Sequence, residues 1–502
     1  MSFKTILFLI LVLLAATAGG AFYLAGQEPG PLATINGPVT IGGGKVTFDV
    51  SVDAVGTKLT QLEARIEQGG QALAVFSLAA PGDARFVQET PDRIRITRAI
   101  APDVVKALKD GPARLILTAE RTVLFGLRKA ASTTARDIKV RKTPPSLSVI
   151  STHHYVKFGG AVMIVYKVTP QDVTSGVEVG DRYFPGYPAS GVPGGKNRDA
   201  SLRLAFFALS FDQDLTTPMR LVARDDAGNM AVAEFEHKTL ADKFHRSRVP
   251  IDDGFLARVV PPILQATPDV KMAAGTADER LSAFLAINSE IRRRNAQQIE
   301  TASKDSSAEM LWHGPFIRMA RAASAAVFAD HRTYIYGDRE IDQQVHLGVD
   351  LASTKGAPIV AANAGRVLFT GFLGIYGNCV IVDHGMGVQS LYAHLSSIDV
   401  EKGDRIDAGE PIGKSGMTGL AGGDHLHFST LVAGRPVNPI EWWDPHWIHD
   451  RIDRKLFEAG ITTDAPTLAE PQEPSTKPAT RVKPKPKAKP PAPAPAKPKK
   501  KR

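Results

Sequence analysis

The sequence predicts a multidomain, mainly β protein, and three observations support this prediction. The chain has 502 residues, which at about 100–200 residues per domain corresponds to roughly three domains. Several segments alternate apolar and polar residues with period two, the pattern of half-buried strands. An uncharged apolar run stands near the start, and a Pro- and Lys-rich run at the end. We therefore expect a transmembrane helix, two β-sandwich-like domains, a helical connector, a C-terminal β domain and a disordered basic tail.

Composition and charge exclude several classes of protein. Hydrophobic residues make up 43% and charged residues 23%, which is ordinary for globular domains and excludes a mainly disordered chain. The single cysteine excludes a disulfide framework and any Cys-based zinc or iron–sulfur site. Residues 474–502 contain 11 Lys/Arg and no acidic residue, so the net charge of +9 becomes 9 − 11 = −2 without them. The basicity is local, and we expect no nucleic-acid partner.

Residues 1–29 contain a candidate membrane segment. Ile6–Ala25 is an uncharged run of 20 residues after Lys4, and a helix of that length spans about 30 Å, the thickness of a bilayer core. One interpretation is an uncleaved signal anchor, which we favour because the apolar run continues past Ala18. The other is a signal peptide cleaved after the small residues Ala16–Ala18. Under both interpretations the rest of the chain is exported.

Two β domains are predicted to follow, at 30–143 and 144–240. Lys45–Val52 and Asp92–Arg98 alternate with period two, and Pro144 marks the boundary. In the second domain, Met219–Glu236 has the pattern of a hairpin around an Asp-Asp-Ala-Gly-Asn turn and resembles bacterial immunoglobulin-like repeats. Neighbours on a strand face opposite ways, so the pair His153 and His154 is not expected to share a metal.

The connector, 241–329, loses this alternation. Residues 278–304 carry apolar side chains at helical spacing, with Glu and Arg between them. The apolar set is Leu281, Phe284, Leu285, Ile287 and Ile291. The last segment, 451–502, is rich in Pro, Lys and Ala beyond Asp464, so we expect a disordered tail with polyproline-II character.

Residues 330–450 contain the candidate chemistry. His346 and Asp350 are four residues apart, and His425 and His427 are two apart. On a strand each pair would face one side, with Gly348 leaving room above the backbone. Two His and one Asp form a ligand set suited to zinc, and a fourth coordination position would remain for water.

Nine short stretches in order, over about 330–445, resemble the lysostaphin-like zinc metallopeptidases (family M23, the LytM domain). The matching stretches are His346–Ala352, Gly356–Ala362, Gly365–Val367, Tyr376–Asn378, Asp383–Gly385, Tyr392–Leu395, Ile412–Gly416, His425–Phe428 and Pro436–Pro439. The resemblance implies a compact, mostly antiparallel β fold with a groove over one zinc ion. It also implies endopeptidase action on the peptide part of peptidoglycan.

The resemblance assigns roles residue by residue. His346, Asp350 and His427 are expected to be the zinc ligands, and His394 and His425 the catalytic histidines. One of the two would assist deprotonation of water and the other would stabilise the tetrahedral oxyanion, with the assignment left open. No departure from these five positions is visible, which matters because relatives lacking ligands activate other cell-wall hydrolases without cutting.

Other residues near these motifs are expected to be structural. His384 is interpreted as structural or groove-lining, with a substrate contact as the alternative. Cys379 is expected to be a small core residue. The tryptophans Trp442, Trp443 and Trp447 are expected to pack the edge of the domain, with glycan binding as the alternative.

The sequence thus predicts a zinc endopeptidase of the bacterial envelope. The N-terminal helix would cross the inner (cytoplasmic) membrane once and place the catalytic domain in the periplasm or its extracytoplasmic equivalent, facing peptidoglycan. Alternatives are a non-catalytic scaffold that activates other hydrolases and an enzyme acting on exported proteins. The sandwiches are expected to act as spacers or to block the groove, in which case a fragment from about residue 310 would be more active. The tail is a candidate for contact with anionic polymers or headgroups.

Overall fold

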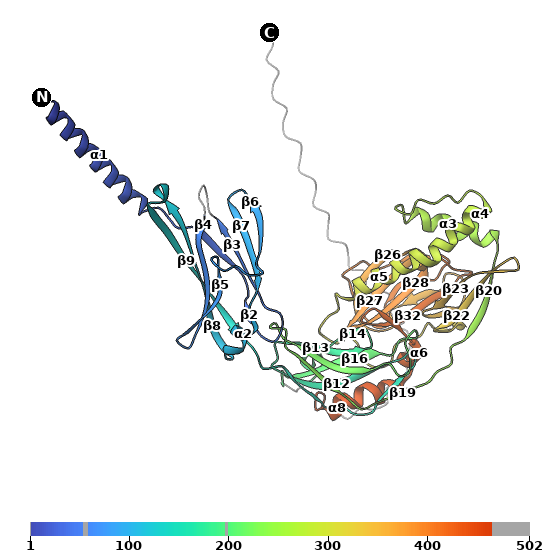
Figure 1. Cartoon of the computed structure of the whole chain (residues 1–502). Helices are drawn as coiled ribbons and strands as arrows, with labels where there is room; N and C mark the ends of the chain where they lie inside the picture. The colour runs from blue at the N-terminus through green and yellow to red at the C-terminus, as the bar shows by residue number, and fades with distance from the viewer. Residues whose placement is uncertain (1, 54–58, 196–198, 464–502) are drawn as a thin grey trace, which may run out of the picture.

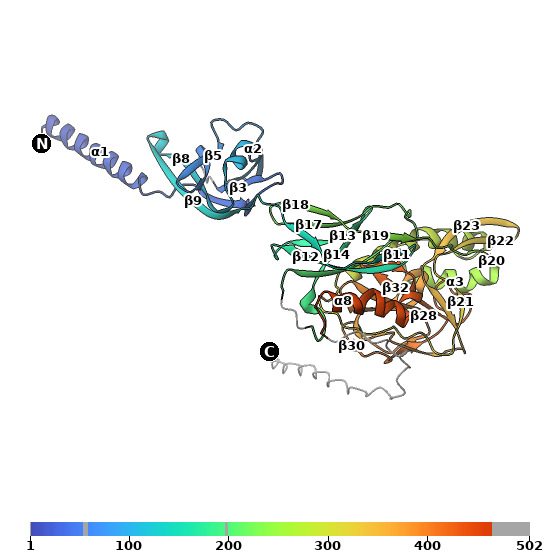
Figure 2. The same ribbon diagram turned by 90° about the horizontal axis from the view of Figure 1, so that it is seen from below.

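The computed structural model describes residues 2–53, 59–195 and 199–463, so the predicted basic tail from 464 onward lies outside the described residues. Helix α1 (Phe3–Ala25) projects away from the β domains (Figures 1 and 2). Ser2 caps its first turn, and Ala25 is its one buried residue. The helix is long and apolar enough to cross a membrane.

The first sandwich packs two sheets against each other beside α1 (Figure 1). The sheet orders are β1-β3-β7-β6 and β2-β9-β8-β4-β5. Phe48, Leu62 and Leu115 are fully buried between the sheets because alternate residues of each strand face inward. The elements are β1 (Leu32–Gly37), β2 (Thr40–Ile41), β3 (Thr47–Asp53), β4 (Leu59–Gln68), β5 (Gln71–Ser77), β6 (Arg85–Thr90), β7 (Arg93–Ala99), α2 (Pro102–Ala107), β8 (Gly111–Val123), η1 (Leu124–Gly126) and β9 (Arg128–Val140).

The second sandwich has the sheet orders β10-β12-β16-β15 and β14-β13-β17-β18, with the parallel pair β11-β19 beside them. The predicted hairpin is present, with Arg224 opposite Met230 across the turn. His154 is buried and bonded to Ser151, whereas His153 is exposed. The elements are β10 (Ser146–Val149), β11 (His154–Lys157), β12 (Ala161–Thr169), β13 (Thr174–Val179), β14 (Arg182–Pro185), β15 (Tyr187–Pro188), η2 (Ala189–Gly191), β16 (Leu202–Ala208), β17 (Met219–Arg224), β18 (Met230–Glu234) and β19 (His237–Leu240).

The connector contains helices and one strand. The elements are β20 (Arg246–Ile251), α3 (Asp253–Gln265), α4 (Ala277–Ala286), the π-helical turn η3 (Ile287–Ile291) and α5 (Arg292–Ser303). A capping box between Thr276 and Glu279 starts α4, so the helical periodicity of this region corresponds to real helix. Strand β20 was not expected, because its partner β22 lies about 80 residues later and pairs with it in parallel.

The C-terminal domain is built on an eight-stranded sheet of order β21-β24-β32-β28-β27-β26-β30, with β33 beside β32. All of its pairings are antiparallel. Two three-stranded sheets, β20-β22-β23 and β25-β31-β29, flank it. The elements are β21 (Ala323–Ala326), β22 (Asp330–Tyr336), β23 (Arg339–His346), β24 (Val349–Ala352), β25 (Pro358–Val360), β26 (Gly365–Phe372), η4 (Gly374–Tyr376), β27 (Asn378–Gly385), β28 (Val388–Leu395), β29 (Ser397–Ile398), β30 (Arg405–Ile406), β31 (Pro411–Lys414), β32 (Leu426–Val432) and β33 (Arg435–Val437).

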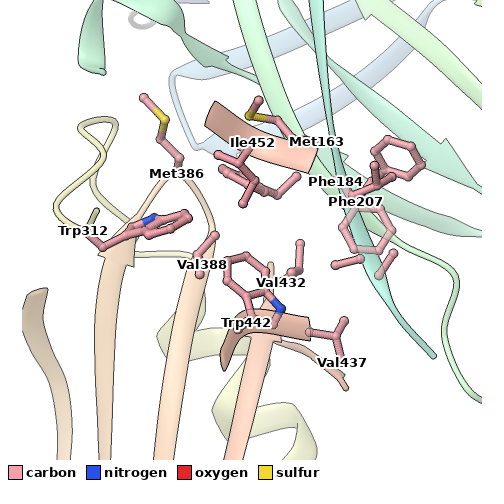
Figure 3. Close-up of a cluster of buried hydrophobic side chains, with 14 of the residues drawn as sticks. Met163, Phe184, Phe207, Trp312, Met386, Val388, Val432, Val437, Trp442 and Ile452 are labelled. Atoms are coloured by element: carbon pink, nitrogen blue, oxygen red, sulfur yellow. The ribbon is translucent and has the colours of Figure 1, made fainter. Parts of the chain in front are cut away.

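The second sandwich and the C-terminal domain share one hydrophobic core. Figure 3 shows Trp442 of the C-terminal domain among side chains of both units. The Trp442 ring lies 5.9 Å from Phe206 of the sandwich and 5.6 Å from Trp312, centroid to centroid. The three C-terminal tryptophans are packing residues, as expected: Trp443 contacts Phe428 and Trp447 contacts Trp442.

Four short helical segments follow the last strand and close this core. They are α6 (Pro439–Trp443), α7 (Pro445–Ile448), the π-helical turn η5 (His449–Asp453) and α8 (Arg454–Glu458). Ile452 is buried, and Lys455 Nζ donates to the Met163 carbonyl of β12 at 2.7 Å. Ordered chain therefore continues beyond residue 450, where the tail was expected to begin, because these residues cover the sandwich.

The shared core affects the hypothesis that the N-terminal part blocks the groove. A fragment beginning near residue 310 lacks β20 and helices α3 to α5, and it also loses the sandwich that covers Trp442. Such a fragment exposes a large apolar surface, which destabilises it. Its activity would report on stability as well as on access to the site.

Candidate metal centre and catalytic site

Three strands of the C-terminal domain bring the expected metal ligands together. His346 ends β23, Asp350 lies in β24, and His427 lies in β32. Asp350 and His427 are directly opposite each other in the antiparallel β24–β32 pair. The sequence suggested that His346 and Asp350 lie on one strand. In the structure they lie on two, because a break at Leu347 and Gly348 separates β23 from β24.

The candidate ligand atoms surround one point. His346 Nε2 lies 2.9 Å from Asp350 Oδ1 and 2.9 Å from His427 Nδ1. His427 Nδ1 lies 3.0 Å from the same Asp350 oxygen. One ligand atom from each residue lies within 4.8 Å of the others, and all three residues are buried.

The ring nitrogens of His346 and His427 that point away from the three-residue cluster make hydrogen bonds, and these fix the tautomer of each ring. His346 Nδ1 lies 2.9 Å from the Val327 carbonyl oxygen, which only accepts, so the proton is on Nδ1. Ser429 Oγ donates to the Leu347 carbonyl oxygen at 2.8 Å and accepts from His427 Nε2 at 3.1 Å. The inward nitrogens, Nε2 of His346 and Nδ1 of His427, therefore both carry lone pairs.

The resulting donor set fits a metal ion. Two imidazole lone pairs and one carboxylate oxygen meet in a buried place, where they repel one another unless a cation lies between them. Nitrogen and oxygen ligands in this ratio are those of three-ligand catalytic zinc sites. The outer hydrogen bonds also orient both rings, as second partners of metal-bound histidines do.

The other oxygen of Asp350 is held by Arg332 of β22. Arg332 Nη2 lies 3.0 Å from Asp350 Oδ2, and Arg332 Nε lies 3.4 Å from Asp330. The ion pair with Arg332 favours the charged form of the Asp350 carboxylate. Asp350 is therefore ionised and turned so that Oδ1 faces the two histidines.

The two expected catalytic histidines lie beside the three expected metal ligands. His394 is the penultimate residue of β28 and has a φ of 63°, and its ring centroid is 4.8 Å from that of His425. His394 Nδ1 donates to the Thr418 carbonyl oxygen at 2.7 Å, so Nε2 is its free side. His425 Nδ1 donates to the Gly423 carbonyl oxygen at 2.8 Å, and its Nε2 lies 3.4 Å from Asp350 Oδ1.

The ionisation of these two histidines differs. Burial lowers the pKa of His394, and the neighbouring histidines lower it further, so the ring is neutral near neutral pH. Burial also lowers the pKa of His425, but the hydrogen bond and charge of Asp350 outweigh it and raise the pKa overall. Neutral His394 presents a lone pair at Nε2, whereas Nε2 of His425 faces Asp350 and donates to it when the ring is protonated.

All five residues line one small cavity of about 100 Å³, together with Tyr376, Arg332 and Arg292. A larger groove of about 640 Å³ continues from it, between the β20–β22 side and β21. Asp350, Arg332 and His425 line both spaces. The site therefore opens into a groove of the size that ligand pockets have.

Two other expected residues lie outside this cavity. His384 is fully buried, with Nδ1 bonded to the Ala364 carbonyl and Nε2 to Ser390, and burial lowers its pKa to about 4. Cys379 is fully buried in an apolar cluster, and burial raises the pKa of its thiol. Both are structural residues, as the sequence suggested.

Sequence reasoning missed three residues that line or support the site. Arg332, Ser429 and Arg292 carry no local signal, because each depends on a partner far away in the chain. Tyr376 lies within a stretch that supported the family resemblance, and its ring is 5.5 Å from that of His427. The Tyr376–Asn378 stretch was the one indication in the sequence that the turn containing Tyr376 belongs to the site.

We predict that Gly348→Ala weakens metal binding. A Cβ at residue 348 would lie 2.6 Å from His427 Nε2 and 2.6 Å from the Phe428 carbonyl oxygen, so His427 must shift. Mutations that disturb the residues orienting a metal ligand typically lower metal affinity by about 10- to 100-fold. Zinc competition with a chromogenic chelator measures this, and Gly254→Ala, in the first turn of α3, where a Cβ makes only an ordinary contact at 3.4 Å, is the control. Unchanged zinc affinity would contradict the close packing of Gly348 on His427.

Comparison with known proteins identifies the segment that carries the site. Residues 344–439 match the model of peptidase family M23. All five site residues, His346, Asp350, His394, His425 and His427, lie within this match.

Curated relatives match the same part of the chain. DD-carboxypeptidase/endopeptidase Mpg of Neisseria meningitidis serogroup B is 42% identical over 116 residues, 23% of this chain and 27% of the relative. Peptidoglycan DD-endopeptidase ShyA of Vibrio cholerae is 41% identical over 96 residues, 19% of this chain and 22% of the relative. Murein hydrolase activator NlpD of Salmonella dublin is 38% identical over 96 residues, 19% of this chain and 25% of the relative. The match thus spans about a quarter of each relative's length.

Proposed function

Because the C-terminal part of the chain is a peptidase M23 domain, we propose that this protein is a zinc metalloendopeptidase that hydrolyses peptide cross-links of peptidoglycan. The observation that carries the proposal is that two imidazole lone pairs and a carboxylate oxygen lie close together in a buried place. Two relatives that share this domain are named for endopeptidase activity, Mpg and ShyA. The proposed ligands of one zinc ion are His346, Asp350 and His427.

The residues around the metal have separate tasks in the proposed reaction. A bound zinc ion supplies Lewis acidity, which polarises a carbonyl group and makes water a stronger acid. His394 presents the lone pair of Nε2 because its proton is committed to the Thr418 carbonyl oxygen, so we assign it the role of proton acceptor from the attacking water. His425 in its protonated form directs an Nε2–H into the site, and we assign it stabilisation of the oxyanion.

The location follows from the N-terminal helix. We propose that α1 is a single membrane anchor in the inner (cytoplasmic) membrane of a bacterium, with the catalytic domain in the periplasm or its extracytoplasmic equivalent. All residues of the helix except Ala25 are exposed, which suits a segment surrounded by lipid. Arg128 contacts the Phe22 ring and carbonyl at the end of the helix, and so joins it to the first sandwich.

The first test is release of soluble muropeptides from purified sacculi by the detergent-solubilised full chain, analysed by mass spectrometry. We expect release that stops when zinc is removed by a chelator and returns when zinc is added. The masses of the products identify the bond that is cut. No release by zinc-loaded protein would contradict the proposed activity.

A second candidate function is activation of another hydrolase. It is favoured by one observation, the match to murein hydrolase activator NlpD over the same domain. An activator would leave sacculi intact and accelerate a separate cell-wall hydrolase when the two are mixed. The complete set of five site residues favours the enzyme, because a binding scaffold has no need of two histidines beside three ligands.

A further inference from the structure

One charged residue of the catalytic cavity comes from the connector. Arg292 is the first residue of α5 and lines the 100 Å³ cavity together with the proposed ligands and both proposed catalytic histidines. It lies outside the M23 match of residues 344–439. The catalytic domain and the connector therefore build the cavity together.

A buried amide holds the Arg292 side chain. Asn288 Oδ1 accepts from Arg292 Nη2 at 2.5 Å and from Nε at 3.2 Å. Asn288 is fully buried, and its Nδ2 donates to Asp342 Oδ2 of β23 at 2.6 Å. Asp342 thus orients Asn288, and Asn288 orients the guanidinium group.

The backbone that carries Arg292 is fixed to the site at a second point. Asn295 Oδ1 accepts from the Ile375 backbone N–H at 3.0 Å, next to Tyr376 of the cavity. A Cβ at Gly374 would lie 2.3 Å from Asn295 Oδ1, so the close approach of helix and turn requires glycine there. The π-helical turn η3 ends at Ile291, immediately before Arg292, and such turns are frequent at functional sites.

The Arg292 guanidinium has no anionic partner among the residues that the structure describes. The other arginine of the cavity, Arg332, lies within ion-pair distance of Asp350 and Asp330. The partner of Arg292 is the neutral amide of Asn288, which occupies Nε and Nη2. A partly buried cation that faces a cavity without a counter-ion favours an anionic ligand.

We propose that Arg292 binds a carboxylate of the substrate peptide, close to the scissile bond. This inference rests on the proposed function and specifies its substrate class: peptides that carry a free carboxylate beside the bond to be cut. Arginine suits this role because its guanidinium group matches the geometry of a carboxylate and stays charged. The contact positions the peptide over the metal centre and selects against substrates in which that carboxylate is an amide.

The test uses the zinc-loaded full chain in detergent and a set of cross-linked peptides in which each free carboxylate is converted in turn to a carboxamide. We expect one conversion to lower kcat/KM of the wild type by about 10- to 100-fold, the usual effect of a lost hydrogen bond to a charged group. Arg292→Gln should cut the unmodified peptide more slowly by the same factor and show no further loss on that conversion. Arg292→Lys should retain part of the preference.

The matched control is Arg293→Gln, an exposed arginine on the same helix, which should behave as wild type. The inference would be overturned if Arg292→Gln lost kcat/KM equally on every peptide and kept the preference for the free carboxylate. It would also be overturned if Arg292→Gln lost no activity. A wild type that is indifferent to every conversion would overturn it as well. If the wild type cuts no peptide, the proposed function fails, and calorimetric binding of the same peptides to metal-free protein decides the role of Arg292 independently.

Discussion

Replacing His346 by alanine is expected to remove the metal and to lower peptide cleavage by about 1000-fold or more. His346 Nε2 is in contact with both other proposed ligands, at 2.9 Å from each. With two ligands left, the site cannot hold zinc in the three-ligand arrangement of catalytic centres. Lewis-acid stabilisation is worth several kcal/mol, and each 1.4 kcal/mol corresponds to about a tenfold change in rate.

A suitable control for this variant is His384→Ala. His384 is also a buried histidine of the same domain with both ring nitrogens hydrogen-bonded, but it lies outside the cavity. Its loss should destabilise the domain to a similar degree and leave zinc stoichiometry unchanged. Zinc content by atomic emission, measured alongside Tm, separates the two effects. Retention of one zinc ion per chain by His346→Ala would show that the metal lies elsewhere.

The candidate site could be predicted from the sequence because its residues lie in short, ordered motifs. The argument from strand geometry placed His346 and Asp350 on one face of a strand, and the structure shows them on two strands separated by a bend. His346 Nε2 nevertheless lies 2.9 Å from Asp350 Oδ1, and the β24–β32 pairing places Asp350 opposite His427. Motif resemblance was therefore more informative than periodicity, since it reflects the folded site and not a local conformation.

The sequence could not show how the site is supported. Arg332 acts on Asp350 from β22, and Arg292, held by Asn288, reaches the cavity from a helical segment more than 50 residues before His346. Periodicity identified that helical segment correctly but carried no information about which of its polar residues line the cavity. Such contacts depend on tertiary packing, which a single sequence does not reveal.

For the fold, too, local structure could be predicted from the sequence and long-range packing could not. Period-two alternation predicted mainly β structure, and apolar residues at helical spacing predicted the helix from 278 to 304; both are present. The shared core of the second sandwich and the C-terminal domain was not predicted, because Trp442 and Phe206 are more than 200 residues apart. Residues 451–458 were assigned to the tail, yet Ile452 and Leu456 lie in the same core.

Replacing His394 by asparagine is expected to leave the metal in place and to lower cleavage by about 100- to 10,000-fold, the range for loss of a general acid or base. His394 contacts the cavity but is not among the three converging ligands. Its backbone has a φ of 63°, a conformation that asparagine adopts more readily than alanine. Asparagine therefore removes the imidazole without adding backbone strain.

The pattern across His394 and His425 tests whether the two histidines work as a pair. If one accepts the proton while the other stabilises the oxyanion, the double variant His394→Asn/His425→Gln should lose little more than the worse single variant, because groups that act as a unit are non-additive. The measurement is kcat and KM on one cross-linked peptide, with zinc content confirmed for each variant. Independent, multiplying losses would indicate separate roles in folding or binding. Loss of zinc in His394→Asn would place that residue in the metal shell, and the assignment of proton acceptor to its Nε2 would then be wrong.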